Sequence, residues 1–151
     1  MNINKFTQKS MEAVQNCEKL AYEHGNQQIE QEHLLYSLLT LDDSLILKLI
    51  TKMNISPEMF VNEAGQAVGR LTKVSGGGQL YVSSDLNKVL INAEDEAKSM
   101  GDEYVSVEHL FLSLIKQPDK TIKEIFRQYG IDRETFLQAL TTVRGNQRVV
   151  S

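Results

Sequence analysis

The sequence predicts an all-α fold of eight helices, arranged as two four-helix repeats related by a pseudo-twofold axis. Two observations carry this prediction. Apolar residues recur at steps of three and four, which places them on one face of each helix. In addition, the second half of the 151-residue chain repeats the first when the sequence is shifted by 76 positions, so that Gly25 falls on Gly101.

The repeat needs no gap in the alignment. The shift places Glu32-His33-Leu34 on Glu108-His109-Leu110. It also aligns aromatic, isoleucine, acidic and glycine positions: Phe60 with Phe136, Ile46 with Ile122, Ile55 with Ile131, Glu58 with Glu134, and Gly69 with Gly145. Self-similarity at a fixed period is the signature of a duplicated structural unit. The two halves are therefore expected to share one fold.

The first copy is expected to form helices near residues 5–24, 31–40, 44–53 and 57–70. An apolar stripe from Met11 to Ala21 defines the first helix, and Gly25 ends it as a C-terminal cap. Leucines at steps of three and four define the second. The fourth begins at Ser56-Pro57-Glu58, which supplies a cap, a first-turn proline and an acid that complements the helix dipole.

The second copy repeats these signals, with helices expected near residues 84–100, 107–116, 119–129 and 133–144. Its first helix has an apolar stripe from Leu86 to Ala97 and ends before Gly101. Leu110, Phe111, Leu114 and Ile115 mark the second, Ile122 lies in the third, and Asp132 occupies the cap position of the fourth.

One domain, residues 1–144, is expected to hold both copies: repeat one at about 5–71, a joint at 72–83 and repeat two at about 84–144. The joint contains Gly76-Gly77-Gly78, which disfavours a helix and predicts flexibility. Each repeat alone would be marginal in size, so the two should pack on each other and leave a groove where they meet. Residues 145–151 lack periodicity and are expected to begin a linker.

Composition argues against several classes of function. The net charge of −4 and pI near 5.4 do not suit a nucleic-acid surface. Cys17 is the only cysteine, which excludes an internal disulfide. The first residues lack the features of a signal peptide, and no apolar run reaches the length of a membrane span. We therefore expect a cytoplasmic protein without a membrane or nucleic-acid partner.

Residues that could do chemistry are sparse, so we expect no enzyme activity, metal or cofactor in this segment. The glycine clusters do not fit G-x-x-x-x-G-K-[ST], the phosphate-binding loop of many ATPases. His33 and His109 each follow a glutamate, but adjacent helix residues point about 100° apart. A capping or packing role is favoured for both histidines. Cys17 lies on an apolar stripe and is expected to be an inert buried residue.

Apolar residues near the joint are the remaining candidates for binding. Leu80, Tyr81 and Val82 adjoin the glycines, and Tyr104 lies in the loop that precedes the second helix of the second copy. They could line a groove for apolar peptide segments, or they could seal the interface between the copies.

Several separated motifs together resemble the amino-terminal domain of Clp-family AAA+ unfoldases. They are Phe6-Thr7-Gln8-Lys9, Glu32-His33-Leu34-Leu35, Val74-Ser75-Gly76-Gly77-Gly78 and the stretch from Gly101 to Leu110. The resemblance covers essentially the whole chain. The ending from Val143 to Val149 is similar to the disaggregase members of the family, where the domain passes into the linker before the first ATPase ring.

The resemblance implies a non-catalytic domain that engages unfolded or aggregated proteins for a hexameric ATPase. ATP and Mg²⁺ would bind to other domains, co-chaperones would be further partners, and the fragment alone would be monomeric. The resemblance also implies a substrate-binding role for Thr7, Asp102 and Glu108, which we expect on an acidic rim beside the joint. Capping and dipole effects could equally explain Thr7 and Glu108. The alternative function is docking of a folded adaptor, as in protease-associated Clp unfoldases.

Overall fold

The computed structural model describes residues 3–76 and 78–145. Within these residues the chain forms eight α-helices, a short 3₁₀-helix at Ile3–Lys5 and two strands of two residues each. The helices are α1 (Gln8–Glu23), α2 (Gln31–Thr40), α3 (Leu45–Lys52), α4 (Pro57–Gly69), α5 (Ser84–Ser99), α6 (Val107–Lys116), α7 (Lys120–Tyr129) and α8 (Arg133–Arg144). The strands are β1 (Gln28–Ile29) and β2 (Tyr81–Val82).

The all-α prediction is confirmed, and each helix lies where the periodicity placed it. The largest difference is at the start of α1, which begins at Gln8 because Thr7 is its N-cap. The predicted caps are present: Ser56 accepts a hydrogen bond from the Met59 N–H, and Asp132 accepts one from the Thr135 N–H. Gly145 ends α8, whereas residues 146–151 of the expected linker lie outside the described residues.

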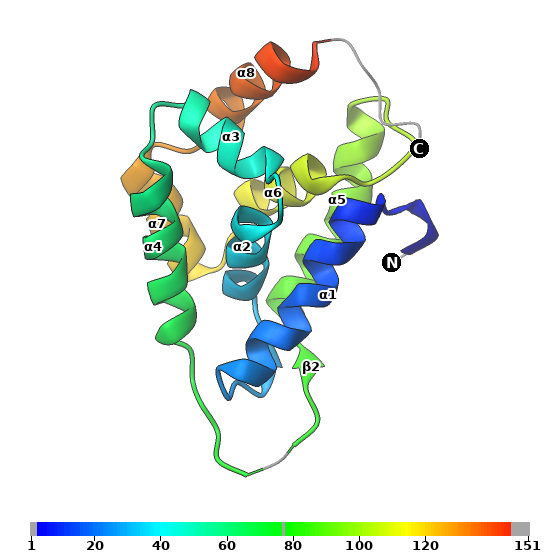
Figure 1. Ribbon diagram of the computed structural model, residues 1–151. Helices are drawn as coiled ribbons and strands as arrows, with labels where there is room; N and C mark the ends of the chain where they lie inside the picture. The colour runs from blue at the N-terminus through cyan, green and yellow to red at the C-terminus, as the bar shows by residue number, and fades with distance from the viewer. Residues whose placement is uncertain (1–2, 77, 146–151) are drawn as a thin grey trace.

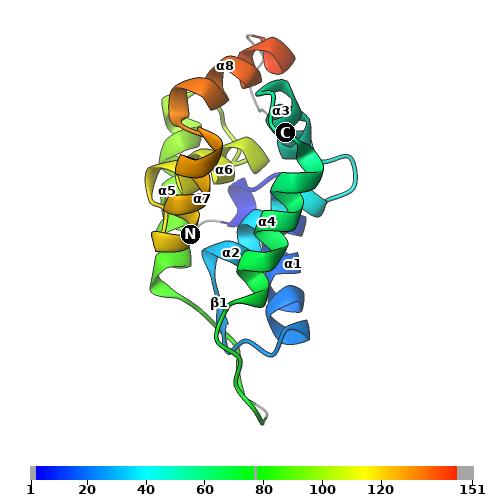
Figure 2. The ribbon, with the colours of Figure 1, turned by 90° about the vertical axis from the view of Figure 1, so that its left-hand side faces the viewer.

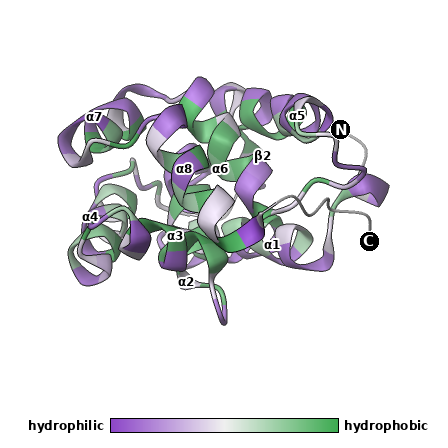
Figure 3. Ribbon diagram, turned by 90° about the horizontal axis from the view of Figure 1, so that it is seen from above, coloured by the Kyte–Doolittle hydropathy of each residue, from purple (hydrophilic) through white to green (hydrophobic). Residues whose placement is uncertain are grey.

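The two copies form two layers. Figure 2 shows α1–α4 on one side of the molecule and α5–α8 on the other, and Figure 3 shows the same division from above. In Figure 3, α6 is largely hydrophobic and lies in the middle, whereas the outer helix α7 is largely hydrophilic. No helix among the described residues is both long and apolar enough to cross a membrane.

Matched hydrogen bonds show that each copy keeps the same internal packing. The Ser37 hydroxyl donates to the Ala13 carbonyl at 2.7 Å in the first copy. At the aligned positions of the second copy, the Ser113 hydroxyl donates to the Val89 carbonyl at 2.6 Å. In both cases the bond fixes the first helix of the copy against the second, so the sequence repeat is also a structural repeat.

A second pair of matched bonds runs between the copies. The Thr7 N–H donates to the Val105 carbonyl at 2.9 Å, and the aligned Ser83 N–H donates to the Ile29 carbonyl at 3.0 Å. The same relation produces the bridge between Phe6 and Val105 and the parallel pairing of β1 with β2. Because each copy gives the other the same contact, the arrangement has the predicted pseudo-twofold character.

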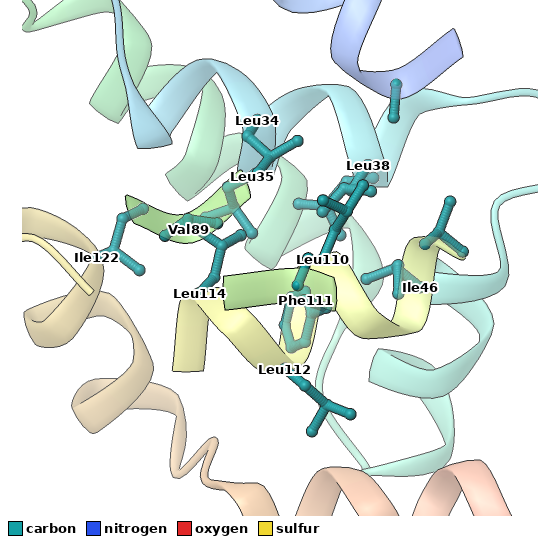
Figure 4. Close-up of a cluster of buried hydrophobic side chains, with 14 of the residues drawn as sticks. Leu34, Leu35, Leu38, Ile46, Val89, Leu110, Phe111, Leu112, Leu114 and Ile122 are labelled. Carbon is teal, nitrogen blue, oxygen red and sulfur yellow. The ribbon is translucent and has the colours of Figure 1, made fainter. Parts of the chain in front are cut away.

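The core lies between the second helices of the two copies, α2 and α6. Figure 4 shows Leu34, Leu35 and Leu38 of α2 close to the side chains that project from α6. Phe111 of α6 stacks on Phe136 with ring centroids 4.7 Å apart and is fully buried. This shared core confirms that the two copies pack on each other, since leucines and aromatics from both would otherwise face water.

The Gln31 side chain forms hydrogen bonds between the two copies at one end of this core. Its side chain is buried, and its Nε2 donates to the main-chain carbonyls of Asp85 and Gln117 at 3.1 and 2.9 Å. Its Oε1 accepts from the Asp119 N–H at 2.8 Å. One side chain from the first copy therefore satisfies three main-chain groups of the second.

Candidate functional site

The residues expected to bind substrate fall into two groups at opposite ends of α1. Thr7, Asp102, Tyr104 and Glu108 lie near the start of α1, which contacts the loop between α5 and α6. Residues 80–82 form or adjoin β2, beyond the other end of α1 (Figure 1). A helix of 16 residues is about 24 Å long, so the two groups do not form one site.

Thr7 has a structural role at the beginning of α1. Its side-chain oxygen accepts from the Ser10 N–H at 3.2 Å, which satisfies one of the free donors of the first turn. The buried Ser10 hydroxyl donates in turn to the Val105 carbonyl at 2.7 Å. Thr7 and Ser10 therefore hold the first helix against the loop of the second copy.

Asp102 and Glu108 are buried, so the expectation of an acidic rim beside the joint is wrong. Asp102 forms an ion pair with Arg144, the last residue of α8, and accepts from the His109 Nε2 at 2.7 Å. Glu108 Oε2 lies 3.5 Å from Arg144 Nη1, and the other carboxylate oxygen accepts from the Ser106 hydroxyl. Each acid is thus held by an internal cation or donor.

His33 and His109, which each follow a glutamate, make the same capping interaction at the start of α2 and α6. His109 Nδ1 accepts from the Ser106 N–H, and His33 Nδ1 accepts from the Glu30 N–H, both at 2.9 Å. His33 Nε2 faces the Asn26 Oδ1 at 2.9 Å, as His109 Nε2 faces Asp102. This geometry confirms the capping role expected of both residues, because both ring nitrogens are occupied.

Burial lowers the pKa of both imidazoles. It lowers the pKa of His33 to about 4, with a further contribution from His24. Burial also lowers the pKa of His109, against the opposing effect of the Glu108 and Asp102 carboxylates. Among the described residues, no three His, Cys, Asp or Glu side chains gather as metal ligands. Cys17 is buried as expected, and burial raises the pKa of its thiol to about 12.

The residues around the joint do not simply seal the interface. Tyr81 and Val82 are 49% and 44% exposed, whereas Leu80 is half-buried and packs against the core. The Tyr81 hydroxyl accepts from Gln28 Nε2 at 2.8 Å. Among the candidates near the start of α1, Tyr104 is half-buried, and the Lys5 Nζ lies 5.8 Å from the centroid of its ring. The joint also contains β2, a strand that the glycine-rich sequence did not predict.

A groove that the sequence did not predict lies within the first copy, between α2, α3 and α4. It has a volume of about 660 Å³. Its apolar wall consists of half-buried Tyr36, Leu47, Pro57 and Val61, and its rim carries Glu58, Asn62 and Gln66. A smaller depression of about 330 Å³ does lie where the copies meet, between the end of α3 and the helices α7 and α8.

Gly65 lets the Tyr36 ring lie close to α4 in the wall of the groove. A Cβ at this position would lie 3.2 Å from a ring carbon of Tyr36, so a larger residue would push the ring from its place. The aligned residue of the second copy is Thr141, and Lys123 replaces Leu47. Leu112, which aligns with Tyr36, is fully buried. These departures from the repeat were the signal in the sequence that could have located the groove.

The comparisons with known proteins agree on one family. The Clp repeat N-terminal domain family matches residues 5–150. The chain is 40% identical over 156 residues to chaperone protein ClpB of Nitratidesulfovibrio vulgaris, and 35% identical over 155 residues to that of Bacillus cereus. All of the chain is covered in both cases, and it spans 18% of the length of these curated relatives.

Solved structures share the fold. The N-terminal domain of Hsp104 from Candida albicans superimposes with a TM-score of 0.84 at 23% identity, covering 97% of this chain and 96% of the other. The N-domain of ClpV in complex with a VipB peptide superimposes with a TM-score of 0.75 at 17% identity, covering 96% and 90%. The family match agrees with the duplicated helices and with the matched hydrogen bonds between the copies. The chain therefore belongs to the Clp repeat N-terminal domain family.

Proposed function

We propose that this chain is the substrate-engaging N-terminal domain of an ATP-dependent disaggregase, and that it binds unfolded or aggregated polypeptide in the groove between α2, α3 and α4. The observation that carries the proposal is the groove itself, with its apolar wall and its single acidic rim residue, Glu58. The curated relatives are chaperones, which supports a polypeptide as the ligand.

The chemistry of the groove suits segments that folded proteins keep inside. An unfolded chain exposes apolar side chains, and burying them against Tyr36, Leu47 and Val61 removes apolar area from water. Basic residues that flank such segments would meet Glu58. A groove of this kind binds many sequences weakly, because it offers shape and hydrophobicity without a specific set of polar contacts.

In this proposal the domain binds and does no bond chemistry. ATP and Mg²⁺ would bind in ATPase domains of a longer, hexameric cytoplasmic protein, and co-chaperones would act on that assembly. Tyr81, Val82 and Tyr104 would add contacts outside the groove. Thr7, Asp102 and Glu108 would act indirectly, by holding α1, α8 and the loop between α5 and α6 in place, and their predicted contact with substrate stays a prediction.

The direct test is a binding titration with a permanently unfolded polypeptide, reduced and carboxymethylated α-lactalbumin, followed by fluorescence anisotropy. The variant Leu47→Lys places in the groove the residue that the second copy has at the aligned position, Lys123. We expect it to weaken binding about fivefold or more, which corresponds to about 1 kcal/mol.

The matched control is Ile91→Lys, which changes an apolar residue that is 49% exposed on α5, outside the groove. It should bind as the wild type does. Equal loss in both variants, or no loss in Leu47→Lys, would contradict the proposal. Docking of a folded adaptor, the alternative, would instead appear as tight binding to one folded protein and none to the unfolded polypeptide.

A further inference from the structure

The outer edge of β2 carries main-chain groups that the fold does not use. The Tyr81 N–H donates to the Gln27 carbonyl at 3.2 Å, and the Ser83 N–H donates to the Ile29 carbonyl at 3.0 Å. In a strand, successive main-chain groups point to opposite sides. Since the Tyr81 and Ser83 N–H groups face β1, the C=O group of Leu80 and the N–H and C=O groups of Val82 face away from it.

No element covers this edge within the described part of the chain. Neither Leu80 nor Val82 has a main-chain hydrogen bond with any described residue, apart from the strand pairing of β2 itself. Val82 is 44% exposed, and Figure 1 shows β2 at the margin of the molecule, where the protruding loop returns to α5. An exposed edge of this kind is a template for pairing with another extended chain.

The aligned position in the first copy differs in the burial of its side chain. Phe6 aligns with Val82 and forms the equivalent bridge, to Val105. Its side chain is only 8% exposed, because it belongs to the core. The two aligned positions therefore differ in their side chains: Phe6 is buried, whereas Tyr81 and Val82 form an exposed apolar pair beside β1.

We propose that the outer edge of β2 binds an extended segment of unfolded polypeptide by strand addition, through main-chain hydrogen bonds to Leu80 and Val82. This inference rests on the proposed function and deepens it, since it adds a second contact with the unfolded polypeptide and states how that contact forms. The incoming segment would become a third strand of the sheet, paired with β2 on the side away from β1. Its side chains would contact Tyr81 and Val82.

The main-chain groups and the apolar side chains at this edge favour an unfolded segment as the ligand. Main-chain donors and acceptors at alternate residues are complementary to any extended backbone, whatever its sequence. A folded partner has most of its main-chain groups already paired, whereas an unfolded chain brings them free. Exposed Tyr81 and Val82 add apolar contact with the side chains that such chains expose.

The sharpest variant is Val82→Pro. Proline lacks the N–H group that would bind the incoming strand, and it is tolerated on an edge strand when that N–H faces solvent. The bonds of Tyr81 and Ser83 to β1 do not use this group. The control is Val82→Ala, which keeps the N–H and shortens the side chain. We expect Val82→Pro to weaken binding of carboxymethylated α-lactalbumin about fivefold or more, with Val82→Ala within about twofold of the wild type.

Amide hydrogen exchange in the wild type gives a readout that does not depend on a variant. At saturation with carboxymethylated α-lactalbumin, exchange of the Val82 N–H should slow about tenfold or more, because a bonded amide exchanges only when the contact opens. Unchanged exchange at Val82 under saturating conditions would overturn the strand addition.

The two proposals fail in different ways. If Leu47→Lys loses binding while the Val82 amide stays unprotected in the wild type, the groove accounts for binding and the strand addition is wrong. If the Val82 amide is protected while Leu47→Lys binds normally, the edge of β2 is the binding site and the groove is not.

Discussion

Arg144 provides the most informative test of how the second copy is held together. It is the last residue of α8, its side chain is 9% exposed, and it forms ion pairs with Asp102 and Glu108. The side chains of these two acids are 0% and 6% exposed. Replacing Arg144 by valine would leave two buried carboxylates without their guanidinium partner.

The expected cost follows from the burial of all three groups. Removing one member of a buried ion pair destabilises a protein by about 3–5 kcal/mol, because the remaining charge is neither hydrated nor compensated. For a domain of about 150 residues this corresponds to a fall of about 6–20 °C in the melting temperature. The measurement is urea unfolding at pH 7, followed by far-ultraviolet circular dichroism.

The repeat supplies the compensating variant. The first copy has Asn26 and Val68 at the positions of Asp102 and Arg144, and Asn26 still bonds its histidine at 2.9 Å. The double variant Asp102→Asn/Arg144→Val should therefore regain part of the stability that Arg144→Val loses, since one of the two buried charges is gone. A loss below about 1 kcal/mol in the single variant, or a double variant no more stable than the single one, would refute this reasoning.

Three further predictions concern buried polar groups. Burial and a hydrogen bond with Asp119 raise the pKa of Glu32 from 4.5 to about 9, so the folded protein retains a proton that the unfolded chain releases. The free energy of unfolding should therefore fall as the pH rises from about 5 to 9, and Glu32→Gln should flatten this decline in urea unfolding; parallel curves would contradict the assignment. Burial raises the pKa of the Cys17 thiol to about 12, so an aromatic disulfide reagent should leave Cys17 intact in the native protein and modify it fully in denaturant; rapid native modification would disprove its burial. The variant Gln31→Leu removes the side-chain bonds to main-chain groups at residues 85, 117 and 119, and should cost about 1–3 kcal/mol in the same unfolding assay; an unchanged midpoint would show that these bonds do not matter.

The helices could be predicted because their signals are local. The apolar stripe of α1 and the cap at Ser56 each depend on residues within a few positions of one another. The strands had no such signal, since each has only two residues and exists through hydrogen bonds between the copies. The repeat itself was visible in the sequence, and the matched bonds of Ser37 and Ser113 show that it extends to individual side chains.

The candidate site was harder to predict because it depends on packing over long sequence distances. The family resemblance placed Asp102 and Glu108 on an acidic rim, although acidic residues can be buried when they are paired. Their burial depends on Arg144, which is 42 residues from Asp102 and comes from a different helix. The groove likewise needs three helices, and only departures from the repeat, such as Gly65 where the second copy has Thr141, hinted at it.

The groove between α2, α3 and α4 of the first copy is the proposed binding site for unfolded polypeptide. The most direct measurement is the change in backbone amide chemical shifts of the ¹⁵N-labelled chain as carboxymethylated α-lactalbumin is added. We expect shifts at Tyr36, Val61 and Gly65, which line the groove. Shifts confined to α5 and α7 of the second copy, or no shifts at the groove under saturating conditions, would contradict it.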